Sequence, residues 1–456
     1  MNRVSRRRFM QGVATVAGAT FVGPYILRAG MPSKKLLFAY IGTGGRGGSH
    51  LGMGEAVAWC DVDRSRWPKG KDGQPRWPNA VGYTDYRKML EKHEKDIDCV
   101  VVATPDHHHY PAAMLALKMN KHVYCEKPLT WSVNEARALA EETAKRRLAT
   151  QMGNQGHANN GNRRVVEWIR AGAIGDVKEV HTWTNRPIWP QGIQQRPPSK
   201  PAPENLDWDC WIGPAPYRDY HDGLHPFAWR GWFDFGCGAI GDMGCHTWDC
   251  VFWAMDPDYP TTVELVKIVG KSSETWPKQS IVKWEYPAKG NRPAFTAYWY
   301  EGGLKPPVPE EILNDPSRTK KQLAGSGSLF IGTKGKLYVE GDYGDSPRLI
   351  PESFMKEWQS QPKDEEYQKK YVIPPSQGGH AGEWLAACRG EKPWDFPGSN
   401  FAKYAGPLTE NMLLGGIAIR LGEEGKKFQC DPVARKILTP EAAALAGREP
   451  RAGWKF

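Results

Sequence analysis

Three glycines with the spacing G-x-G-x-x-G follow the first apolar segment of this sequence. Residues 36–41 form that segment, and Gly42, Gly44 and Gly47 come directly after it. A loop of this kind turns tightly after a strand and lets the backbone approach a pyrophosphate, because glycine has no side chain. A helix that starts at the end of the loop would present N–H groups to the phosphates. The spacing therefore predicts a dinucleotide site.

An acidic residue stands where such a site needs one. Residues 55–60 form a second apolar segment, and Asp61 follows it about 19 residues after Gly42. A carboxylate at this position accepts hydrogen bonds from ribose hydroxyls and repels a 2′-phosphate. Arg64 is near enough in sequence to weaken that repulsion. We predict NAD as the cofactor, with Asp61 setting the choice.

Two other groups of polar residues could do chemistry, but their spacing alone assigns none. Asp242 and His246 are four residues apart and would share one face of a helix, and Asp249 follows on the same side. A surface ion pair is the ordinary interpretation of such a pair. Residues 107–109 are three consecutive histidines, whose side chains point in different directions. We therefore expect no metal site.

The elements that must position these residues alternate in the first third of the chain. Apolar runs at 98–103, 122–125 and 148–153 read as strands, and residues 111–118 and 130–147 read as helices. Polar residues follow the strands at 104–106, 126–128 and 154–155. The carboxyl ends of strands in an open α/β sheet are where ligands bind. We predict a Rossmann domain over residues 36–155.

The pattern changes from residue 156 onward. Residues 161–172 read as a linking helix, and turn residues separate later segments with strand character, at 177–183, 262–269, 281–286, 294–300 and 329–339. Hairpin signals of this kind predict an open-faced antiparallel sheet, so the expected fold is α/β followed by α+β, with the second domain over 156–456. Residues 186–235 are rich in Pro and Trp and could form a lid over the cleft.

Tryptophan is unusually frequent, with 20 in the chain. Eight of them lie between Trp183 and Trp253. Packing is the ordinary role of a buried indole. Flat aromatic faces also stack on the C–H faces of sugars, so the cluster favours a carbohydrate site without requiring one.

Taken together, these motifs resemble the Gfo/Idh/MocA family of oxidoreductases (glucose–fructose oxidoreductase, inositol dehydrogenase and relatives). The similarity covers nearly all of the chain after residue 35, and it is carried by residues 42–47, Asp61-Val62-Asp63, residues 104–109, Glu126-Lys127-Pro128 and residues 241–246. It implies the same two-domain fold, whose second sheet often forms an oligomer interface. A homo-oligomer is therefore expected.

The resemblance also implies roles for particular residues. It places Lys127, Asp242 and His246 around the reacting carbon, with Lys127 holding the substrate oxygen and Asp242 orienting both. His246 is expected to be the base, because the pKa of histidine is close to neutrality. His380 could reach the substrate as well, although a surface histidine at a helix start is an equal alternative. The residues expected at the cofactor are Gly42, Gly44, Gly45, Arg46, Gly47, Asp61, Thr104, Pro105, His109, Glu126, Lys127 and Asn154.

The N-terminal residues resemble a targeting signal rather than part of a folded domain. Residues 5–10, Ser-Arg-Arg-Arg-Phe-Met, precede an apolar stretch at 13–27, which resembles a twin-arginine export signal over residues 1–35. Export of the folded protein to the periplasm is expected, with the signal cleaved or kept as an anchor.

Residues 1–35 also hold seven Lys and Arg and no acid, so the net charge of +10 leaves only +3 elsewhere. That excludes a nucleic-acid footprint.

Nine cysteines, an odd number, argue against a complete disulfide framework.

Three functions stay open at this point. The first is oxidation of a hydroxyl on a sugar, sugar derivative or cyclitol, with tightly bound NAD that is recycled. The second is a redox-neutral glycosidase that oxidises, eliminates, hydrates and re-reduces its substrate. The third is an inactive sugar- or dinucleotide-binding protein, which the presence of Lys127, Asp242 and His246 disfavours.

Overall fold

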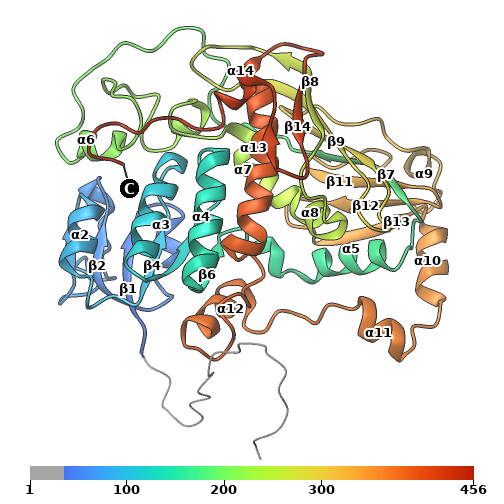
Figure 1. Ribbon diagram of the computed structural model, residues 1–456, viewed down its shortest axis with the longest axis horizontal. Helices are drawn as coiled ribbons and strands as arrows, with labels where there is room; N and C mark the ends of the chain where they lie inside the picture. The colour runs from blue at the N-terminus through green and yellow to red at the C-terminus, as the bar shows by residue number, and fades with distance from the viewer. Residues whose placement is uncertain (1–34, 456) are drawn as a thin grey trace, which may run out of the picture. The chain divides into compact units, whose positions relative to one another are not determined.

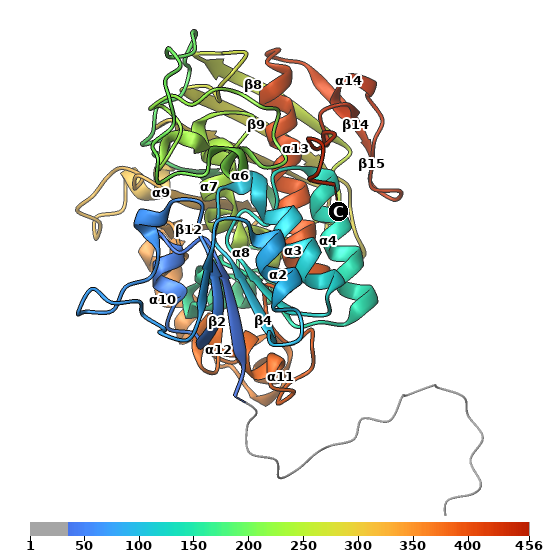
Figure 2. The same cartoon turned by 90° about the vertical axis from the view of Figure 1, so that its left-hand side faces the viewer.

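Two β-sheets organise the computed structural model, which describes residues 35–455 (Figure 1). Residues 5–10 and 13–27, on which the predicted export signal depends, lie outside the described residues. Figure 2 shows the first sheet edge-on in blue, below the segment that contains α6 and α7. Most of the site residues predicted from the sequence line a cleft between these parts of the chain.

The first sheet has six parallel strands in the order β3-β2-β1-β4-β5-β6, which is the Rossmann arrangement. Its strands are short apolar runs because both faces are covered. Ala39 and Ile41 pack toward the helices, whereas Phe38 and Tyr40 pack toward Trp384 of a later helix. The elements are β1 (Leu37–Ile41), β2 (Glu55–Cys60), β3 (Val81–Tyr83), β4 (Cys99–Val102), β5 (His122–Cys125), β6 (Thr150–Met152), α2 (Tyr86–Lys92), α3 (His109–Lys118) and α4 (Val133–Arg146).

The helix expected after the glycine loop is the first point at which the structure differs. Only a single 3₁₀ turn, η1 (Gly47–His50), follows the loop before β2 begins at Glu55. The short link contains Gly47, Gly48, Gly52 and Gly54, which disfavour a helix through their backbone entropy. The loop amides, rather than a full helix dipole, therefore face the phosphate position.

The second sheet has nine strands in the order β13-β12-β11-β7-β10-β9-β8-β14-β15. The hairpin strands pair antiparallel as predicted, but β7 pairs parallel with β10, so the sheet is mixed. A parallel pair needs a long crossover, and the segment between β7 and β8 begins it. The predicted strand 329–339 is a hairpin of two strands. The strands are β7 (Val177–Trp183), β8 (Thr262–Val269), β9 (Gln279–Tyr286), β10 (Phe295–Glu301), β11 (Gly327–Gly332), β12 (Lys336–Glu340), β13 (Ser346–Ile350), β14 (Lys427–Asp431) and β15 (Lys436–Ile437).

Helices from the second half of the chain join the two sheets. In Figure 1, α13 stands between α4 and the second sheet, and it contacts α4, α7 and β8. The remaining described helices are α5 (Asn160–Arg170), α6 (Trp208–Ile212), α7 (Gly238–Thr247), α8 (Asp249–Met255), α9 (Glu310–Leu313), α10 (Glu352–Ser360), α11 (Glu365–Tyr371), α12 (Gly379–Cys388), α13 (Gly406–Leu421) and α14 (Pro440–Ala443), with single turns at η2 (Arg64–Arg66), η3 (Asp106–His108), η4 (Gln155–Ala158) and η5 (Ala228–Gly231) and a π-helix at η6 (Phe401–Ala405).

The open edge of β6 is covered by a segment from much later in the chain. Met152 N–H donates to the carbonyl of Ser399 at 3.0 Å, and Ser399 N–H donates to Gln151 Oε1 at 3.1 Å. Phe401 N–H donates to the Thr150 hydroxyl at 3.0 Å. The first bond pairs a backbone group of the β6 edge, the other two hold residues 399–401 against side chains of β6, and the segment thereby covers an edge that could pair with other chains.

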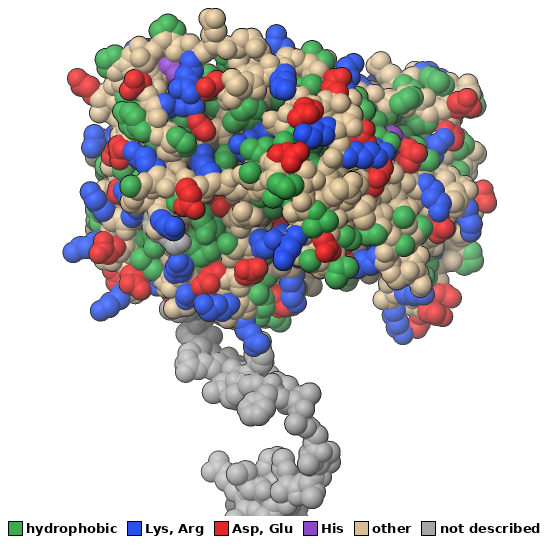
Figure 3. Space-filling model, turned by 45° about the horizontal axis from the view of Figure 1, so that its top comes forward, with side chains coloured by type: hydrophobic (Ala, Val, Ile, Leu, Met, Phe, Trp, Pro, Cys, Tyr) green, Lys and Arg blue, Asp and Glu red, His purple; other side chains and the backbone are tan. Residues whose placement is uncertain are grey.

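The tryptophan cluster is mainly a packing feature. Of its eight members only Trp253 is less than nine-tenths buried. All nine cysteines lie in the described part of the chain, where each is buried as a free thiol. Figure 3 shows Lys and Arg interspersed with Asp and Glu over one face, without a single-sign stripe. In residues 35–455 no helix is long and apolar enough to cross a membrane, and no three His, Cys, Asp or Glu side chains gather as metal ligands would.

Candidate active site

A cleft of about 500 Å³ lies between the carboxyl ends of the first sheet and the second half of the chain. The glycine loop and the residues after β2, β4 and β5 line one side. Residues of α7, of the segment 186–230 and of two later positions, Tyr343 and Trp454, line the other. Its volume is in the range of ligand sites, and its position is where an open α/β sheet binds nucleotides.

The glycine loop fits a dinucleotide. Gly42 has a φ of +80°, and a Cβ there would lie 2.4 Å from the carbonyl oxygen of Ala103. Gly47 is held as closely, with its virtual Cβ 2.1 Å from the Gly42 oxygen. Gly45, in contrast, faces open space at a φ of +51° and lines the cleft. Two glycines thus close the turn. Gly45 leaves the loop open to the cleft, whereas the Arg66 side chain packs against Gly44.

Asp61 lies at the predicted place, at the end of β2, and is buried. Its Oδ2 accepts hydrogen bonds from the N–H groups of Thr43 at 2.9 Å and Gly44 at 3.2 Å. Its Oδ1 also accepts from the Asp63 N–H at 3.0 Å. A carboxylate has about four acceptor positions, so one position remains for a ribose hydroxyl. Arg64 does not line the cleft, whereas Arg66 does, and Arg66 is paired with Asp63 at 3.2 Å.

Glu126 contacts the glycine loop at Arg46 and the turn after it at His50. It lies 2.7 Å from His50 Nε2 and accepts a hydrogen bond from Arg46 Nε at 3.1 Å. Burial would raise the pKa of this carboxyl, but the hydrogen bond with His50 and the charges of His50 and Arg46 outweigh it and lower the pKa to about 2. Glu126 is therefore ionised and fixes Arg46 beside the cleft.

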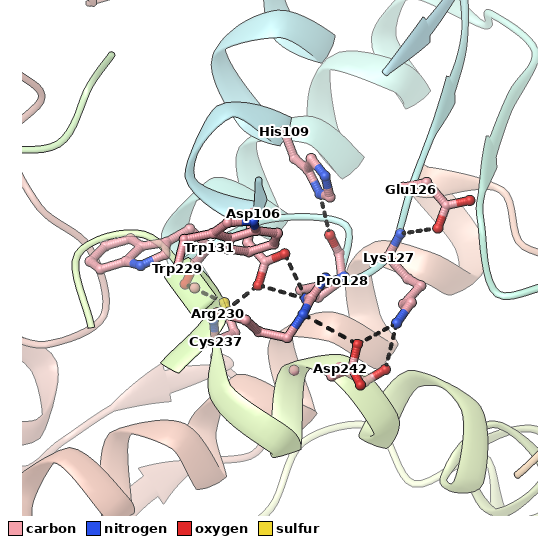
Figure 4. Close-up of polar contacts among 12 residues, drawn as sticks. Asp106, His109, Glu126, Lys127, Pro128, Trp131, Trp229, Arg230, Cys237 and Asp242 are labelled. Carbon is pink, nitrogen blue, oxygen red and sulfur yellow. Dashed lines mark hydrogen bonds and ion pairs between the residues drawn. The ribbon is translucent and has the colours of Figure 1, made fainter. Parts of the chain in front are cut away.

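Lys127 and Asp242 meet across the cleft (Figure 4). Lys127 Nζ donates to Asp242 Oδ1 at 2.7 Å and to the Asp242 carbonyl at 2.9 Å. Burial alone would lower the pKa of Lys127, and the Asp242 charge raises it. An ammonium has three donors, so Lys127 keeps one N–H for a substrate oxygen. The sequence-based hypothesis that these two residues lie together agrees with this geometry.

Arg230 lines the cleft and was not singled out by the sequence analysis. Its Nη1 donates to Asp106 Oδ1 at 2.9 Å, and its Nε lies 3.3 Å from Asp242 Oδ1 (Figure 4). Burial opposes ionisation of Asp242, but Lys127 and Arg230 hold its pKa well below the usual range. The only sequence signal was its place between Trp229 and Trp232 in the predicted lid.

His246 lies on α7, four residues after Asp242, and both line the cleft. The imidazole is buried, packs edge-on against Tyr343 at 5.0 Å between ring centres, and its Nδ1 has no hydrogen-bond partner. Burial, followed by the nearby Lys127 charge, lowers the pKa of His246 to about 3. The ring is thus neutral at pH 7 with an acceptor nitrogen, as a proton acceptor must be, although its pKa is far from the neutral value expected from sequence.

Not every predicted site residue lines the cleft. Thr104 and Pro105 do, but Gly47, His109, Asn154 and His380 do not. His109 lies 2.6 Å from the Pro128 carbonyl and 2.9 Å from the Thr104 carbonyl, so it ties together the loops after β4 and β5 (Figure 4). His380 lies 2.6 Å from the Met152 carbonyl, behind β6.

Asn154 belongs to a buried network centred on Asp249. Asp249 accepts from Asn154 Nδ2 at 3.2 Å and from the Tyr404 hydroxyl at 2.7 Å, and it lies 3.0 Å from His157 Nδ1. The expectation that Asp249 shares a face with His246 is wrong, because α7 ends at Thr247 and Asp249 begins a new helix.

Aromatic residues of the cleft were also unassigned by sequence. Trp211 and Trp229, both from the tryptophan-rich segment, line it, as do Tyr343 and Trp454. The tryptophan count drew attention to the first two. Tyr343 and Trp454 carried no signal, since each stands outside any motif.

Comparison with known proteins agrees with this geometry. A model of the Gfo/Idh/MocA oxidoreductase family, NAD-binding Rossmann fold, matches residues 16–154, and a model of the family's C-terminal alpha/beta domain matches residues 175–285. Together they cover more than half of the chain, which belongs to this family of oxidoreductases. Its first sheet is accordingly part of an NAD-binding Rossmann domain.

Individual relatives are distant and differ in their activities. A Glycosyl hydrolase family 109 protein of Solibacter usitatus is 30% identical over 200 residues, which is 39% of this chain and 45% of that protein. Inositol 2-dehydrogenase of Salmonella paratyphi B is 29% identical over 128 residues, 28% of this chain and 37% of that one. The chain thus spans less than half the length of either curated relative.

Among solved structures, the fold resembles WlbA dehydrogenase of Chromobacterium violaceum, which was crystallised with NADH and UDP-GlcNAcA. The TM-score is 0.58 at 17% identity, with 89% of this chain and 99% of that chain covered. This similarity concerns the fold alone.

Proposed function

We propose that this protein is an NAD-dependent oxidoreductase that acts on a hydroxyl of a sugar, sugar derivative or cyclitol. The observation that carries the proposal is the meeting of Lys127, Asp242 and His246 on the wall of the cleft that also holds the glycine loop. A bound NAD supplies a hydride acceptor for the carbon that bears the hydroxyl. The remaining chemistry is removal of the hydroxyl proton and stabilisation of the oxygen.

Each side chain has a role that its geometry supports. His246 lines the cleft and is neutral, so a ring nitrogen that carries no proton accepts the hydroxyl proton. Lys127 donates its third N–H to the same oxygen and stabilises the negative charge that develops there. Asp242 holds the ammonium in place and accepts from a neighbouring hydroxyl. Arg46, Asp61 and the glycine loop hold the dinucleotide.

A redox-neutral glycosidase is the second candidate. It is favoured by the similarity to a Glycosyl hydrolase family 109 protein and to 2,7-anhydro-N-acetylneuraminate hydratase of Escherichia coli, which is 31% identical over 96 residues, 20% of this chain and 26% of that protein. The same proton acceptor and oxygen-binding ammonium would serve its oxidation step. Both candidates retain NAD: the glycosidase returns the hydride to the same sugar, whereas the oxidoreductase passes it to a separate acceptor.

One experiment separates the two candidates. The protein is purified without added cofactor and denatured, and the supernatant is assayed for NAD. The native protein is then given aryl glycosides and free sugars without an external hydride acceptor. Ketose or lactone formed only when an acceptor is added supports the oxidoreductase. Glycoside cleavage without an acceptor supports the glycosidase instead of the oxidoreductase. If neither aryl glycosides nor free sugars give a product, both candidates are wrong.

We also propose export and assembly as a homo-oligomer. The arginine pair in residues 5–10 supports export, since this route carries folded proteins with their cofactors. Arg6→Lys with Arg7→Lys should leave the protein in the cytoplasm, and unchanged export refutes the signal.

The half-buried Ile281 and Tyr298 on the second sheet support self-association. A monomeric mass by light scattering refutes that part.

A further inference from the structure

The last described residues pack onto the first domain rather than extending into solvent. Terminal segments are ordered only where something holds them, and here Trp454 is 3% exposed. The Arg87 guanidinium of α2 lies over the Trp454 ring at 3.8 Å, and Arg87 Nη1 donates to the Gly453 carbonyl at 2.8 Å. Residues 446–455, termed the strap below, thus reach the helix that follows β3.

The strap is also joined to the tryptophan-rich segment. Arg451 donates to the Asp209 carbonyl at 2.8 Å and to the Gly213 carbonyl at 3.0 Å, and it forms an ion pair with the Asp209 carboxylate. Arg448 donates to the Asp234 carbonyl at 2.7 Å. The strap therefore bridges α2 of the first domain and residues 209–234.

That segment is in turn fastened beside Asp61. Asp207 N–H donates to the Val62 carbonyl at 2.8 Å, and Asn205 Nδ2 donates to Asp63 Oδ1 at 2.6 Å. His225 Nε2 lies 2.9 Å from Asp63 Oδ2. Residues 205–225 are thus tied to the turn after β2, where the ribose next to adenine is expected.

The two segments place aromatic rings at this end of the cleft. Trp454 lines it together with Tyr86 and Trp211, and the Trp454 ring is 5.8 Å from Tyr86 and 5.4 Å from His108 between centres. Flat apolar faces beside a ribose-binding carboxylate suit a purine ring. Nothing in the proposed hydride chemistry needs Trp454.

We propose that the strap closes the adenosine end of the cleft and retains NAD between turnovers, with Trp454 as its contact to the adenosine and Arg451 and Arg87 as its two fastenings. The dinucleotide then leaves only when the strap lifts from Asp209 and Arg87. The inference rests on the NAD site of the proposed function, and it holds for either candidate reaction.

The test measures release of NADH from the full-length protein. The protein is loaded with NADH, excess NAD is added, and the loss of nucleotide fluorescence gives the dissociation rate constant. Trp454→Ala and Arg451→Gln should each raise this rate by about tenfold or more, because changes in affinity appear mainly in dissociation. Lys455→Ala is the matched control, since its side chain in the same strap is 81% exposed and should leave the rate unchanged.

The outcomes separate the alternatives. An unchanged rate in both variants overturns the strap. Slower release in Trp454→Ala also overturns it, because the indole would then occupy the adenosine position itself. If Trp454→Ala fails to fold, the NADH release rate of Arg451→Gln tests the proposal instead. That variant keeps the Trp454 ring and removes only the contacts of Arg451 with Asp209 and Gly213. If the parent protein binds no NADH, the NAD site of the proposed function fails instead, and that result is read before any variant is compared.

Discussion

Arg230 forms an ion pair with Asp242, with its Nε 3.3 Å from Asp242 Oδ1, while Lys127 contacts the same oxygen at 2.7 Å. The Arg230 guanidinium also binds Asp106, whose side chain is wholly buried. One residue from the tryptophan-rich segment thus couples the loop after β4 to the helix that carries His246. The Asp242 carboxylate has two cationic partners, Lys127 and Arg230, and only Lys127 was expected from the sequence.

Replacing Arg230 should damage both stability and turnover. In Arg230→Gln, Asp106 loses its cation while buried, and breaking such a pair costs roughly 3–5 kcal/mol. Turnover should fall because Asp242 is then held by Lys127 alone. Arg230→Lys should recover part of the stability but less of the turnover, since an ammonium cannot reproduce the two-sided contact. Melting temperature and kcat test this, and parent-like values for Arg230→Gln contradict it.

His246 should be needed for the chemical step and not for folding. Its Nδ1 has no partner, so His246→Ala breaks no hydrogen bond at that atom. Loss of a general base typically costs about 10²–10⁴ in rate. We expect kcat to fall at least about a hundredfold while NAD binding and melting stay close to the parent. His93→Ala, at a position outside the cleft, is the control, and near-parent turnover of His246→Ala would mean that another group is the base.

Lys127 should matter for turnover in a different way. Lys127→Met removes the donor to the substrate oxygen, and loss of such a donor costs roughly 10²–10³ in kcat. Arg230 still neutralises Asp242 in this variant, so the protein should fold. Asp242→Asn keeps the shape of the contact and should lower kcat less than Lys127→Met does. The reverse order of the two effects would show that Asp242, not Lys127, carries the chemistry.

The pH dependence of kcat/KM should lack an acid limb near 6.5. Burial and the Lys127 charge lower the pKa of His246 to about 3, so this base stays unprotonated throughout the neutral and mildly acidic range. We expect kcat/KM to be flat between about pH 5 and pH 7, because kcat/KM reports groups of the free enzyme. An inflection near pH 6.5 in the parent that disappears in His246→Ala would show that the imidazole is less shielded than the structure indicates.

Stability, in contrast, should fall in acid because of other buried imidazoles. Burial lowers the pKa of His108 and His380 to about 4, against 6.5 for the exposed side chain. Between these values the unfolded chain binds more protons than the folded one, so the free energy of unfolding rises with pH there. Each shift corresponds to roughly 3 kcal/mol over the whole window. Burial raises the pKa of Glu301 to about 7, which acts in the opposite sense between 4.5 and 7.

The check is the melting temperature as a function of pH. The parent should melt lower at pH 4.5 than at pH 6.5, and His380→Gln should show a smaller difference between the two, whatever its absolute stability. An equal difference in parent and variant would remove His380 from the explanation.

Asp61 should set the choice of dinucleotide. Its carboxylate is held at the end of β2 by two loop N–H groups, and Arg66, the arginine that lines the cleft, is paired with Asp63. A 2′-phosphate would therefore meet a negative charge without a free cation beside it. Titration of cofactor-free protein should give tighter binding of NAD than of NADP, and Asp61→Ser should reduce the preference by about tenfold. Equal or tighter NADP binding by the parent defeats this assignment.

Local patterns accounted for much of the first domain. The strands β2 and β5 have the predicted bounds, because an apolar run buried on both faces is readable without knowledge of its neighbours. The strands β7 and β8 were readable from their alternation and turns. Lys127 and Asp242 were brought together by family resemblance, and they do meet.

Features that depend on contacts between residues far apart in the sequence could not be predicted from local patterns. The parallel pairing of β7 with β10 depends on where a crossover of more than 100 residues returns. Arg230 and Trp454 are isolated in sequence and gain their positions only from partners 124 and 367 residues away, Asp106 and Arg87. The pKa of His246 was misjudged because burial, which a sequence motif does not show, dominates it.

The covering of β6 by residues 399–401 has a consequence for biosynthesis. The amino-terminal sheet leaves the ribosome first, but the groups that complete its edge are synthesised about 250 residues later. Until then the nascent Rossmann domain carries an exposed strand edge, which is a template for aggregation. Its maturation is therefore set by the time needed to finish the chain, and a chaperone that shields the edge during translation should raise the yield of active protein.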